Sequence, residues 1–348
     1  MTADAEDAVL LRTEGRAAYL TLNRPRTINA LDHAMGLRVA AALEQWAADP
    51  SVATVVLAGA GERGLCAGGD IRAVRESLAR DGGQAAADFW RDEYRLNLAI
   101  ARYPKPYVAL MDGIVMGGGV GLSGHGSVRV VTERSRIAMP ETGIGFVPDV
   151  GGTHLLARAP GELGTHLALT GEAIGAADAI ACGLADHFVP AERLGALAAA
   201  LAERDPAEVL PEFAAEAPAG VLGGWRAWID HCYAAPGVEE ILDRLDASGV
   251  PEAKQTAETI RGKSPSALKI TLAAVRRSRA LGDLAQVLEQ EFRVSCNASQ
   301  LPDLSEGIRA QIIDKDRRPK WSPATLAEVP AAIVEACFAP TPHGVLFD

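Results

Sequence analysis

The chain has 348 residues, a hydrophobic fraction of 48% and a net charge of −11 at neutral pH. This length predicts about two folding units, and the apolar content is sufficient for a large core. The excess of negative charge repels phosphate groups, so we expect neither nucleic acid nor a membrane surface as a partner. No apolar run approaches the roughly 18 residues that a membrane span requires, which excludes a transmembrane protein.

The N-terminal stretch "MTADAEDAVLL" is acidic and resembles neither a secretory signal nor an Arg-rich transit peptide. We therefore predict a cytoplasmic location. The cysteines are odd in number and form no C-x-x-C pair or Cys/His cluster, which disfavours disulfides and structural zinc. Reduced and mostly buried thiols are expected at Cys66, Cys182, Cys232, Cys296 and Cys337.

Strand and helix signals alternate over the first two hundred residues. Residues 8–22 predict a hairpin that turns at Glu14-Gly15-Arg16. Apolar residues at helical spacing follow between Leu31 and Trp46, and "ATVVLAG" (53–59) predicts a buried strand. A glycine-rich loop then leads to a helix after Asp70, which is a suitable N-cap.

Further strands are predicted at "PYVALMDG" (106–113), "SVRVVTE" (127–133) and "ADHFVP", the last following a helix that ends near Gly183. This alternation predicts an α/β fold with at least partly parallel strands. The pattern changes at residue 205. We predict a core over residues 1–205, a loose proline-containing connection over 206–235 and a helical C-terminal region over 236–348.

The stretch "GGGVGLSGHG" (117–126) places glycines directly after a predicted strand. A flexible linker would be polar, and this stretch lies between apolar strands. The pattern Gly119-x-Gly121-x-x-Gly124 matches a dinucleotide fingerprint, but it comes too late in the fold and lacks the expected carboxylate about 20 residues on. A nucleophile elbow at Ser123 fails because His125 occupies a required glycine position.

A fourth interpretation fits these glycines better than the linker, the dinucleotide fingerprint or the nucleophile elbow. The glycines begin a helix, and its free N–H groups face a ligand oxygen. Glycine lets the main chain approach closely, and a helix N-terminus favours negative charge. "GLCAGGD" (64–70) is a second small-residue loop between a strand and a helix. Two main-chain donors from separate loops are the usual cradle for an oxyanion, so the two loops together indicate acyl chemistry.

Two carboxylates lie among apolar residues in "AMPETGIGFVPDVGGTHLL" (138–156). Glu141 is either a solvated loop acid or an acid of the site. Asp149 suits the N-cap of a helix beginning at Val150, and it can serve the site as well. A carboxylate in a partly dry pocket has a raised pKa and can act as a general base or a nucleophile.

Glu93 falls on the apolar face of the helix predicted over residues 86–103, in line with Phe89, Leu96 and Ile100. Taken alone, the pattern favours a side chain that reaches past the edge of the core to water. The alternative is contact with a polar group in a pocket, because unpaired burial would cost about several kcal/mol. Nothing places Cys66 beside His125 or His154, so a Cys/His nucleophile is disfavoured.

These motifs resemble the crotonase (enoyl-CoA hydratase/isomerase) superfamily, and most closely its 3-hydroxyisobutyryl-CoA hydrolase branch. The resemblance covers nearly the whole chain. It rests on "CAGGDI", "GGGVGLS", "MPETGIGFVPDVGGTHLL" and "LALTGEAIGAADAIACGLADHFVP", and for the branch on "RDEYRLN", "KSPSALKITL" and "EGIRAQIIDKDRRPKW".

The resemblance implies a spiral of ββα units followed by helices that often serve self-association, so a homo-oligomer is expected. It also implies a coenzyme A thioester as the substrate, with no separate cofactor and no metal. The oxyanion donors would be the N–H groups of Gly69 and Gly118. Glu141 would be the catalytic carboxylate, Asp149 its partner and Glu93 a contact to the substrate hydroxyl. Coenzyme A would lie against the main chain of "TINAL" and "CAGGDI", at Ala30, Ala67, Gly69 and Ile71.

The resemblance also distinguishes two reactions. Hydratases of this superfamily carry a glutamate three residues after the oxyanion glycine, where this chain has Gly121, and usually a glycine where it has Asp149. We therefore expect hydrolysis of a short-chain acyl-CoA, with 3-hydroxyisobutyryl-CoA and valine catabolism implied by the branch. The alternatives are an enoyl-CoA hydratase or isomerase of the same fold, and a non-catalytic interaction protein. The sequence is compatible with direct attack by Glu141 and with activation of water by Glu141.

Overall fold

A computed structural model describes residues 8–347, so most of the acidic N-terminal stretch lies outside the described residues. The chain divides into two compact units, and each is assembled from separate stretches of sequence. The first unit comprises 1–70, 95–138 and 174–220, and the second comprises 71–94, 139–173 and 221–348. The division into 1–205, 206–235 and 236–348 stays a prediction about organisation along the chain.

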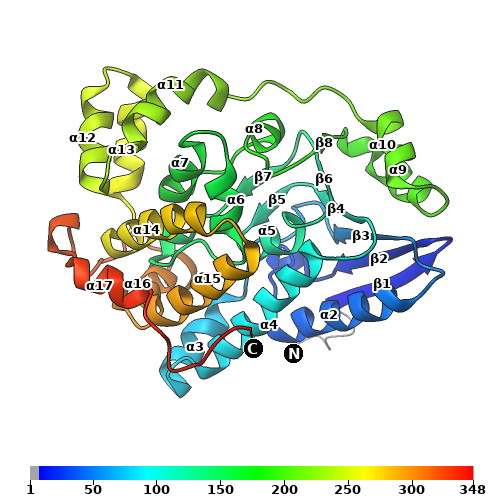
Figure 1. Cartoon of the computed structure of the whole chain (residues 1–348), viewed down its shortest axis with the longest axis horizontal. Helices are drawn as coiled ribbons and strands as arrows, with labels where there is room; N and C mark the ends of the chain where they lie inside the picture. The colour runs from blue at the N-terminus through cyan, green and yellow to red at the C-terminus, as the bar shows by residue number, and fades with distance from the viewer. Residues whose placement is uncertain (1–7, 348) are drawn as a thin grey trace. The chain divides into compact units, whose positions relative to one another are not determined.

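The first unit is built on a six-stranded sheet with the order β1-β2-β3-β4-β6-β8. Figure 1 shows β1, β2 and β3 side by side. β1 and β2 form the predicted antiparallel hairpin, with Gly15 at a φ of +56° in its turn, and the remaining pairs are parallel. The strands are β1 (Val9–Glu14), β2 (Ala17–Leu22), β3 (Thr54–Gly59), β4 (Tyr107–Met111), β6 (Val128–Val131) and β8 (His187–Phe188).

A second, two-stranded parallel sheet pairs β5 (Ile114–Met116) with β7 (Arg136–Ala138). Neither strand is predicted from the sequence, because three residues are too few to show an alternating pattern. The core of this unit joins the central strands to helices α9 and α10, through residues such as Tyr19, Val108 and Leu197. Its helical elements are η1 (Pro25–Thr27), α2 (His33–Ala48), α5 (Gly118–Ser123), α8 (Ala176–Ala181), η3 (Ala191–Arg193), α9 (Leu194–Leu201) and α10 (Pro206–Phe213).

The described part of the second unit is helical. Helix α4 (Gln84–Ala101) runs from the second unit into the first. In the second unit α14 packs against α6, α7 and α15, and α12 packs against α13, as can be followed in Figure 1. The other elements are α3 (Ile71–Asp81), η2 (Glu141–Ile144), α6 (Gly152–Arg158), α7 (Leu163–Thr170), α11 (Leu222–Tyr233), α12 (Val238–Ala247), α13 (Pro251–Arg261), α14 (Pro265–Leu281), α15 (Leu284–Ala298), α16 (Pro302–Ile308), η4 (Arg309–Ile313), η5 (Leu326–Glu328) and α17 (Ala331–Cys337).

The expected loose connection over 206–235 is wrong, because it contains α10 and α11. Pro206 stands in the first turn of α10, where a missing N–H costs nothing, and Asp205 caps that helix through the Ala207 N–H. The helical character predicted for 236–348 is confirmed. All five cysteines lie within the described residues and are buried, reduced thiols, as expected. Between residues 8 and 347 no helix combines the length and apolarity needed to cross a bilayer.

Candidate active site

Two glycine-containing loops lie side by side in the first unit. Cys66 and Val115 form a parallel bridge, in which the Met116 N–H donates to the Cys66 carbonyl at 2.9 Å. The loop 64–70 thus runs beside the segment that leads from β5 into α5. Helix α5 begins at Gly118, so the glycines do start a helix, as the sequence predicts.

Close approach of these loops explains why side chains are absent here. A Cβ atom on Gly119 would lie 2.5 Å from the Cys66 carbonyl oxygen, which is far inside van der Waals contact. Gly68 has a φ of +108°, which side chains rarely adopt, and a Cβ on it would lie 3.8 Å from the Gly118 nitrogen. Glycine at these positions brings the two main chains together.

The predicted donors are the N–H groups of Gly69 and Gly118. Among residues 8–347 neither N–H donates to a main-chain carbonyl. The flanking amides of the first loop are engaged, since the Asp70 N–H donates to the Leu31 carbonyl at 2.8 Å. Gly118 opens α5, so its N–H is one of the donors that a helix leaves unused.

The main chain around "TINAL" lies against the loop 64–70. The Ala67 N–H donates to the Ile28 carbonyl at 2.9 Å, and the Leu31 N–H donates to the Gly68 carbonyl at 2.8 Å. Ile28 and Asn29 both have positive φ angles, which is unusual for residues other than glycine. The Asn29 amide holds this conformation by donating to the carbonyls of Ala60, Gly64 and Leu65 at 3.1 Å each.

Three carboxylates come together in the second unit. Glu141 begins η2 and is 7% exposed, Asp149 is 7% exposed and Glu93 on α4 is 3% exposed. Burial and the negative charge of Asp149 raise the pKa values of both Glu93 and Glu141 well above the ordinary range. Burial also raises the pKa of Asp149, to about 6. Oε2 of Glu141 and Oε1 of Glu93 are buried and have no hydrogen-bond partner among residues 8–347.

Asp149 is oriented by Tyr94, whose hydroxyl donates to Oδ2 at 2.7 Å and lies 2.8 Å from Oγ of Ser295. The Tyr94 hydrogen bond lowers the Asp149 pKa and so opposes the effect of burial. The predicted N-cap role of Asp149 is wrong. Helix α6 begins at Gly152 with Gly151 as its cap residue and without a side-chain cap of its own. The carboxylate instead faces the tyrosine.

A fourth carboxylate, Glu291 on α15, is buried beside this group. Its Oε2 accepts the Gly151 N–H at 2.6 Å, and its Oε1 accepts both the N–H and the hydroxyl of Thr153. Burial is the main cause that raises its pKa, to about 8. Glu291 thus holds the main chain just after Asp149.

The expectation that Glu93 reaches water is wrong, and the alternative of a pocket contact is the one that its burial favours. Sequence patterns gave no sign of Tyr94, Glu291 or Ser295, because each acts through partners far away in the chain. The one signal available in the sequence was the position of Tyr94 inside the motif "RDEYRLN". Cys66 Sγ accepts the Gly68 N–H at 3.4 Å, and burial is the main cause that lowers the pKa of His154.

The described residues contain no group of three or more His, Cys, Asp or Glu side chains arranged to hold a metal ion.

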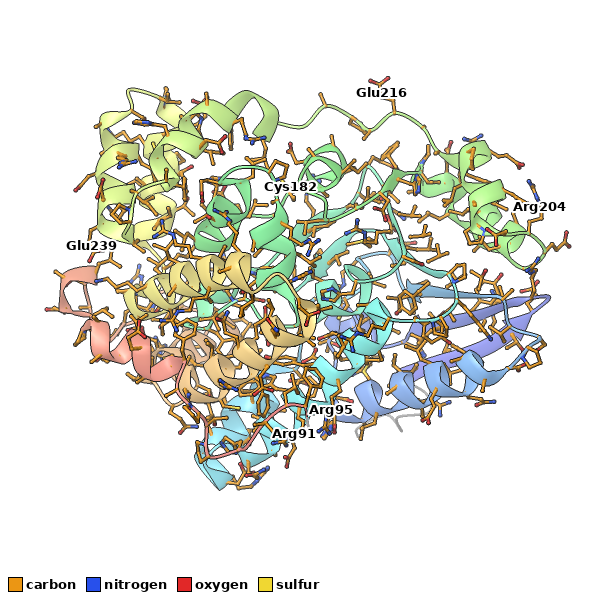
Figure 2. All side chains as sticks on the ribbon, viewed as in Figure 1. Arg91, Arg95, Cys182, Arg204, Glu216 and Glu239 are labelled. Carbon is orange, nitrogen blue, oxygen red and sulfur yellow. The ribbon has the colours of Figure 1, made fainter. Side chains whose placement is uncertain are left out.

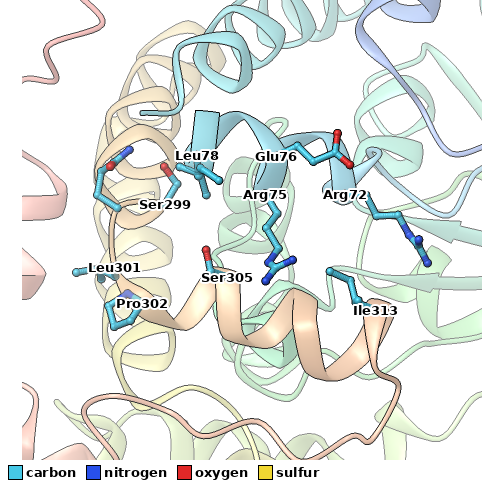
Figure 3. Close-up of a pocket in the computed structure, with 11 residues that line it drawn as sticks. Arg72, Arg75, Glu76, Leu78, Ser299, Leu301, Pro302, Ser305 and Ile313 are labelled. Carbon is cyan, nitrogen blue, oxygen red and sulfur yellow. The ribbon is translucent and has the colours of Figure 1, made fainter. Parts of the chain in front are cut away.

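A pocket of about 540 Å³ lies elsewhere in the second unit, between α3 and α16. Figure 3 shows Arg72 and Arg75 of α3 beside this pocket, with Ser305 and Ile313 across it. Helix α3 begins at Ile71, immediately after "CAGGD".

The enoyl-CoA hydratase/isomerase family model matches residues 17–338. The chain is 42% identical to the mitochondrial 3-hydroxyisobutyryl-CoA hydrolase of Danio rerio, over 97% of this chain and 91% of the relative. It is 44% identical to that of Rattus norvegicus, over 92% and 86%. It also resembles a crystal structure of a carnitinyl-CoA dehydratase from Mycobacterium thermoresistibile, with a TM-score of 0.94 and 52% identity over 97% of this chain and 98% of that chain.

The chain therefore belongs to the enoyl-CoA hydratase/isomerase family, and the resemblance noted in the sequence is confirmed. The predicted α/β fold with a helical C-terminal region is confirmed too. The predicted cytoplasmic location is wrong, because the curated relatives are mitochondrial proteins. The cytoplasmic prediction rested on the lack of a recognisable targeting pattern in the first residues, and such a lack does not identify a compartment.

Proposed function

We propose that this protein hydrolyses a short-chain acyl-CoA thioester, specifically 3-hydroxyisobutyryl-CoA, to the free acid and coenzyme A. The observation that carries the proposal is the buried group of Glu93, Glu141 and Asp149, in which Glu141 keeps an oxygen without a partner. The hydrolase names of the relatives support the same substrate. Valine catabolism is the pathway that this substrate would serve.

The Gly69 and Gly118 N–H groups would hold the thioester oxygen. Negative charge develops on this oxygen when the carbonyl carbon is attacked, and fixed main-chain donors stabilise that charge without reorganisation. Support comes from the close approach of the two loops and from the finding that neither N–H has a main-chain acceptor within the described part of the chain. Glu141 follows the last residue of β7 by only three positions, and β7 pairs with β5, which leads to Gly118.

Glu141 would bring about the attack on the carbonyl carbon, by one of two balanced routes. As a general base it takes a proton from water, the hydroxide oxygen bonds to carbon, and the thiolate leaves and is protonated. As a nucleophile its own oxygen bonds to carbon, the thiolate leaves, and water then cleaves the mixed anhydride. A single turnover in ¹⁸O-labelled water separates the first route from an anhydride that water cleaves at the Glu141 carbonyl carbon, because label then enters the Glu141 carboxylate, which the first route never labels.

Asp149 would tune the pKa of Glu141, and Glu93 would select the acyl group of the substrate. Burial, and after it the charge of Asp149, raises the pKa of Glu141 and makes its carboxylate a stronger base. Glu93 would accept a hydrogen bond from the 3-hydroxyl of the acyl group, and its Oε1 is free for that purpose. A site built to bind a hydroxyl discriminates against acyl groups that lack one.

Coenzyme A would lie along the main chain at Ala30, Ala67 and Gly69 and reach the start of α3 at Ile71. Its phosphate groups need cationic donors, and guanidinium groups pair well with phosphate. We propose that the pocket lined by Arg72 and Arg75 takes the phosphate-bearing end of coenzyme A. No further cofactor is required by this chemistry.

Hydration of an enoyl-CoA is the main alternative, and the dehydratase name of the similar crystal structure agrees with it. Gly121 argues against hydration, because it stands where hydratases carry their first glutamate and cannot transfer a proton. A non-catalytic interaction protein would not be expected to keep buried acids without partners. Self-association through residues 236–348 stays a prediction, which sedimentation of the purified protein tests.

A thiol-release assay tests the proposal directly. We expect coenzyme A release from 3-hydroxyisobutyryl-CoA, slower release from isobutyryl-CoA, and no loss of enoyl absorbance from crotonyl-CoA. Loss of the enoyl absorbance without free thiol would instead establish a hydratase. No reaction with any of the three thioesters would contradict the proposed function.

A further inference from the structure

Helix α15 carries two buried side chains on one face, Glu291 and Ser295, which are one helical turn apart. Both reach the segment that contains Asp149. Ser295 lies 2.8 Å from the Tyr94 hydroxyl that donates to the Asp149 carboxylate, and Glu291 accepts main-chain donors just beyond Asp149. The side chain and the main chain of Asp149 are therefore both held from α15.

The main chain that follows Asp149 is strained. Val150 has a φ of +54°, and a branched side chain in this left-handed region is a true outlier. Gly151 follows with a φ of +76°, and the Gly152 N–H closes the turn on the Asp149 carbonyl at 2.6 Å. Such conformations persist only where the surrounding structure enforces them.

Glu291 supplies that constraint. It accepts the N–H groups of Gly151 and Thr153 at 2.6 and 2.9 Å, and the Thr153 hydroxyl at 2.5 Å. These two N–H groups belong to the start of α6, which has no side-chain cap of its own. Glu291 thus caps α6 from a position 140 residues further along the chain.

Helix α15 is itself fixed against α4 at this point. The Phe292 ring packs edge-on against Tyr94, with ring centroids 6.4 Å apart, and the Arg91 guanidinium lies 5.0 Å from the Phe292 centroid. Figure 2 shows Arg91 on α4. Glu291 therefore holds the turn from a packed helix rather than from a loop.

We propose that Glu291 is a positioning residue. It keeps the turn over residues 149–152, the Asp149 turn, in its strained conformation and so places the Asp149 carboxylate for thioester hydrolysis. This inference rests on the proposed function, because it assigns Glu291 a role through Asp149. Nothing in it requires Glu291 to touch the substrate.

The test is a pair of substitutions measured alone and together in the full-length protein. Glu291→Gln keeps the size of the side chain but puts a donor opposite one of the two N–H groups. We expect kcat for 3-hydroxyisobutyryl-CoA to fall by up to about 10²-fold, as for other small displacements of a reacting group, while KM stays near the wild-type value. In an Asp149→Asn background the same substitution should lower kcat no further.

Glu289→Gln is the matched control. Glu289 lies on the same helix and also accepts main-chain N–H groups, but from Leu346 and Phe347 near the end of the chain. The Glu289→Gln substitution should leave kcat unchanged. If Glu291→Gln proves too unstable to purify, Thr153→Val removes the hydroxyl, with its contacts to Glu291 and Ser278, at nearly constant volume. We then expect a smaller fall of kcat with the same dependence on Asp149.

Two results would overturn the inference while the proposed function survives. One is wild-type kcat in both Glu291→Gln and Thr153→Val. The other is a fall of kcat that multiplies with that of Asp149→Asn, which would mean that Glu291 supports only the general structure. Failure of the wild-type protein to release thiol would instead contradict the proposed function, and the inference with it.

Discussion

The Tyr94 hydroxyl donates a hydrogen bond of 2.7 Å to Asp149, and both groups are buried. This bond lowers the Asp149 pKa, which burial raises to about 6. Tyr94→Phe should therefore raise the Asp149 pKa further, by about one to two units for the loss of a hydrogen bond to a charged group. If ionised Asp149 is needed for turnover, the acidic limb of the kcat/KM profile moves to higher pH.

Tyr107→Phe provides the control for this experiment. Tyr107 is also fully buried, but its hydroxyl has no hydrogen-bond partner in the structure. Its removal should leave the pH profile where it is. An acidic limb that stays fixed in Tyr94→Phe would show that Asp149 does not govern activity through its charge.

Gly119→Ala tests the close approach of the two loops. The added Cβ would meet the Cys66 carbonyl oxygen at 2.5 Å, so the loops must separate and the Gly69 and Gly118 donors must move apart. Loss of one oxyanion donor costs about 10²–10³-fold in kcat, and we expect a fall of this size. Gly36→Ala on α2 meets no atom within 4 Å and should keep full activity. Equal activity in both variants would show that the close approach of the loops plays no part in the reaction.

Glu93→Gln tests the selection of a hydroxylated acyl group. Replacing the carboxyl group by an amide should weaken its hydrogen bond to the substrate hydroxyl. The preference for 3-hydroxyisobutyryl-CoA over isobutyryl-CoA should fall by about 10-fold or more, measured as the ratio of kcat/KM values. The folded protein should be no less stable, since Glu93 Oε1 has no partner to lose. Asp88→Asn, at an exposed position of the same helix, is the control. An unchanged ratio would exclude Glu93 as the hydroxyl acceptor.

Arg75→Ala tests the site for the phosphate-bearing end of coenzyme A. We expect KM for the acyl-CoA to rise about 10-fold with little change in kcat, as for a charge-assisted contact used in binding alone. A thioester of N-acetylcysteamine, which has no phosphate, should be hydrolysed equally well by the variant and the wild type. Arg80→Ala, whose side chain is 66% exposed on the same helix, should behave as the wild type. A KM that rises equally for both substrates would contradict this location.

Much of the first unit could be predicted from the sequence because its signals are local. The hairpin at Gly15, the buried strand at 54–59 and the helix beginning at Gly118 each follow from turn chemistry or from an apolar pattern. The strands β5 and β7 escaped prediction because each has only three residues. Their pairing depends on a neighbour 22 positions away, Ile114 with Arg136, which no local pattern reports.

The acids of the candidate site could be predicted from the sequence, but the residues that hold them in place could not. Glu141 and Asp149 stood out as acids among apolar residues, and the structure places both in one buried group with Glu93. The wrong expectations for Asp149 and Glu93 share a cause. A local pattern assigned each acid to water or to a helix end, whereas tertiary packing buried it. Glu291 reaches the Asp149 turn across 140 residues, a separation that sequence patterns cannot bridge.

Glu141→Gln with 3-hydroxyisobutyryl-CoA is the most direct test of the proposed chemistry. The amide keeps the shape of the side chain but can neither take a proton from water nor form an anhydride. We expect thiol release to fall by roughly 10²–10⁴-fold, with binding of the thioester retained by calorimetry. Near-normal thiol release from this variant would contradict the account, because no other group in it is assigned to attack the carbonyl carbon.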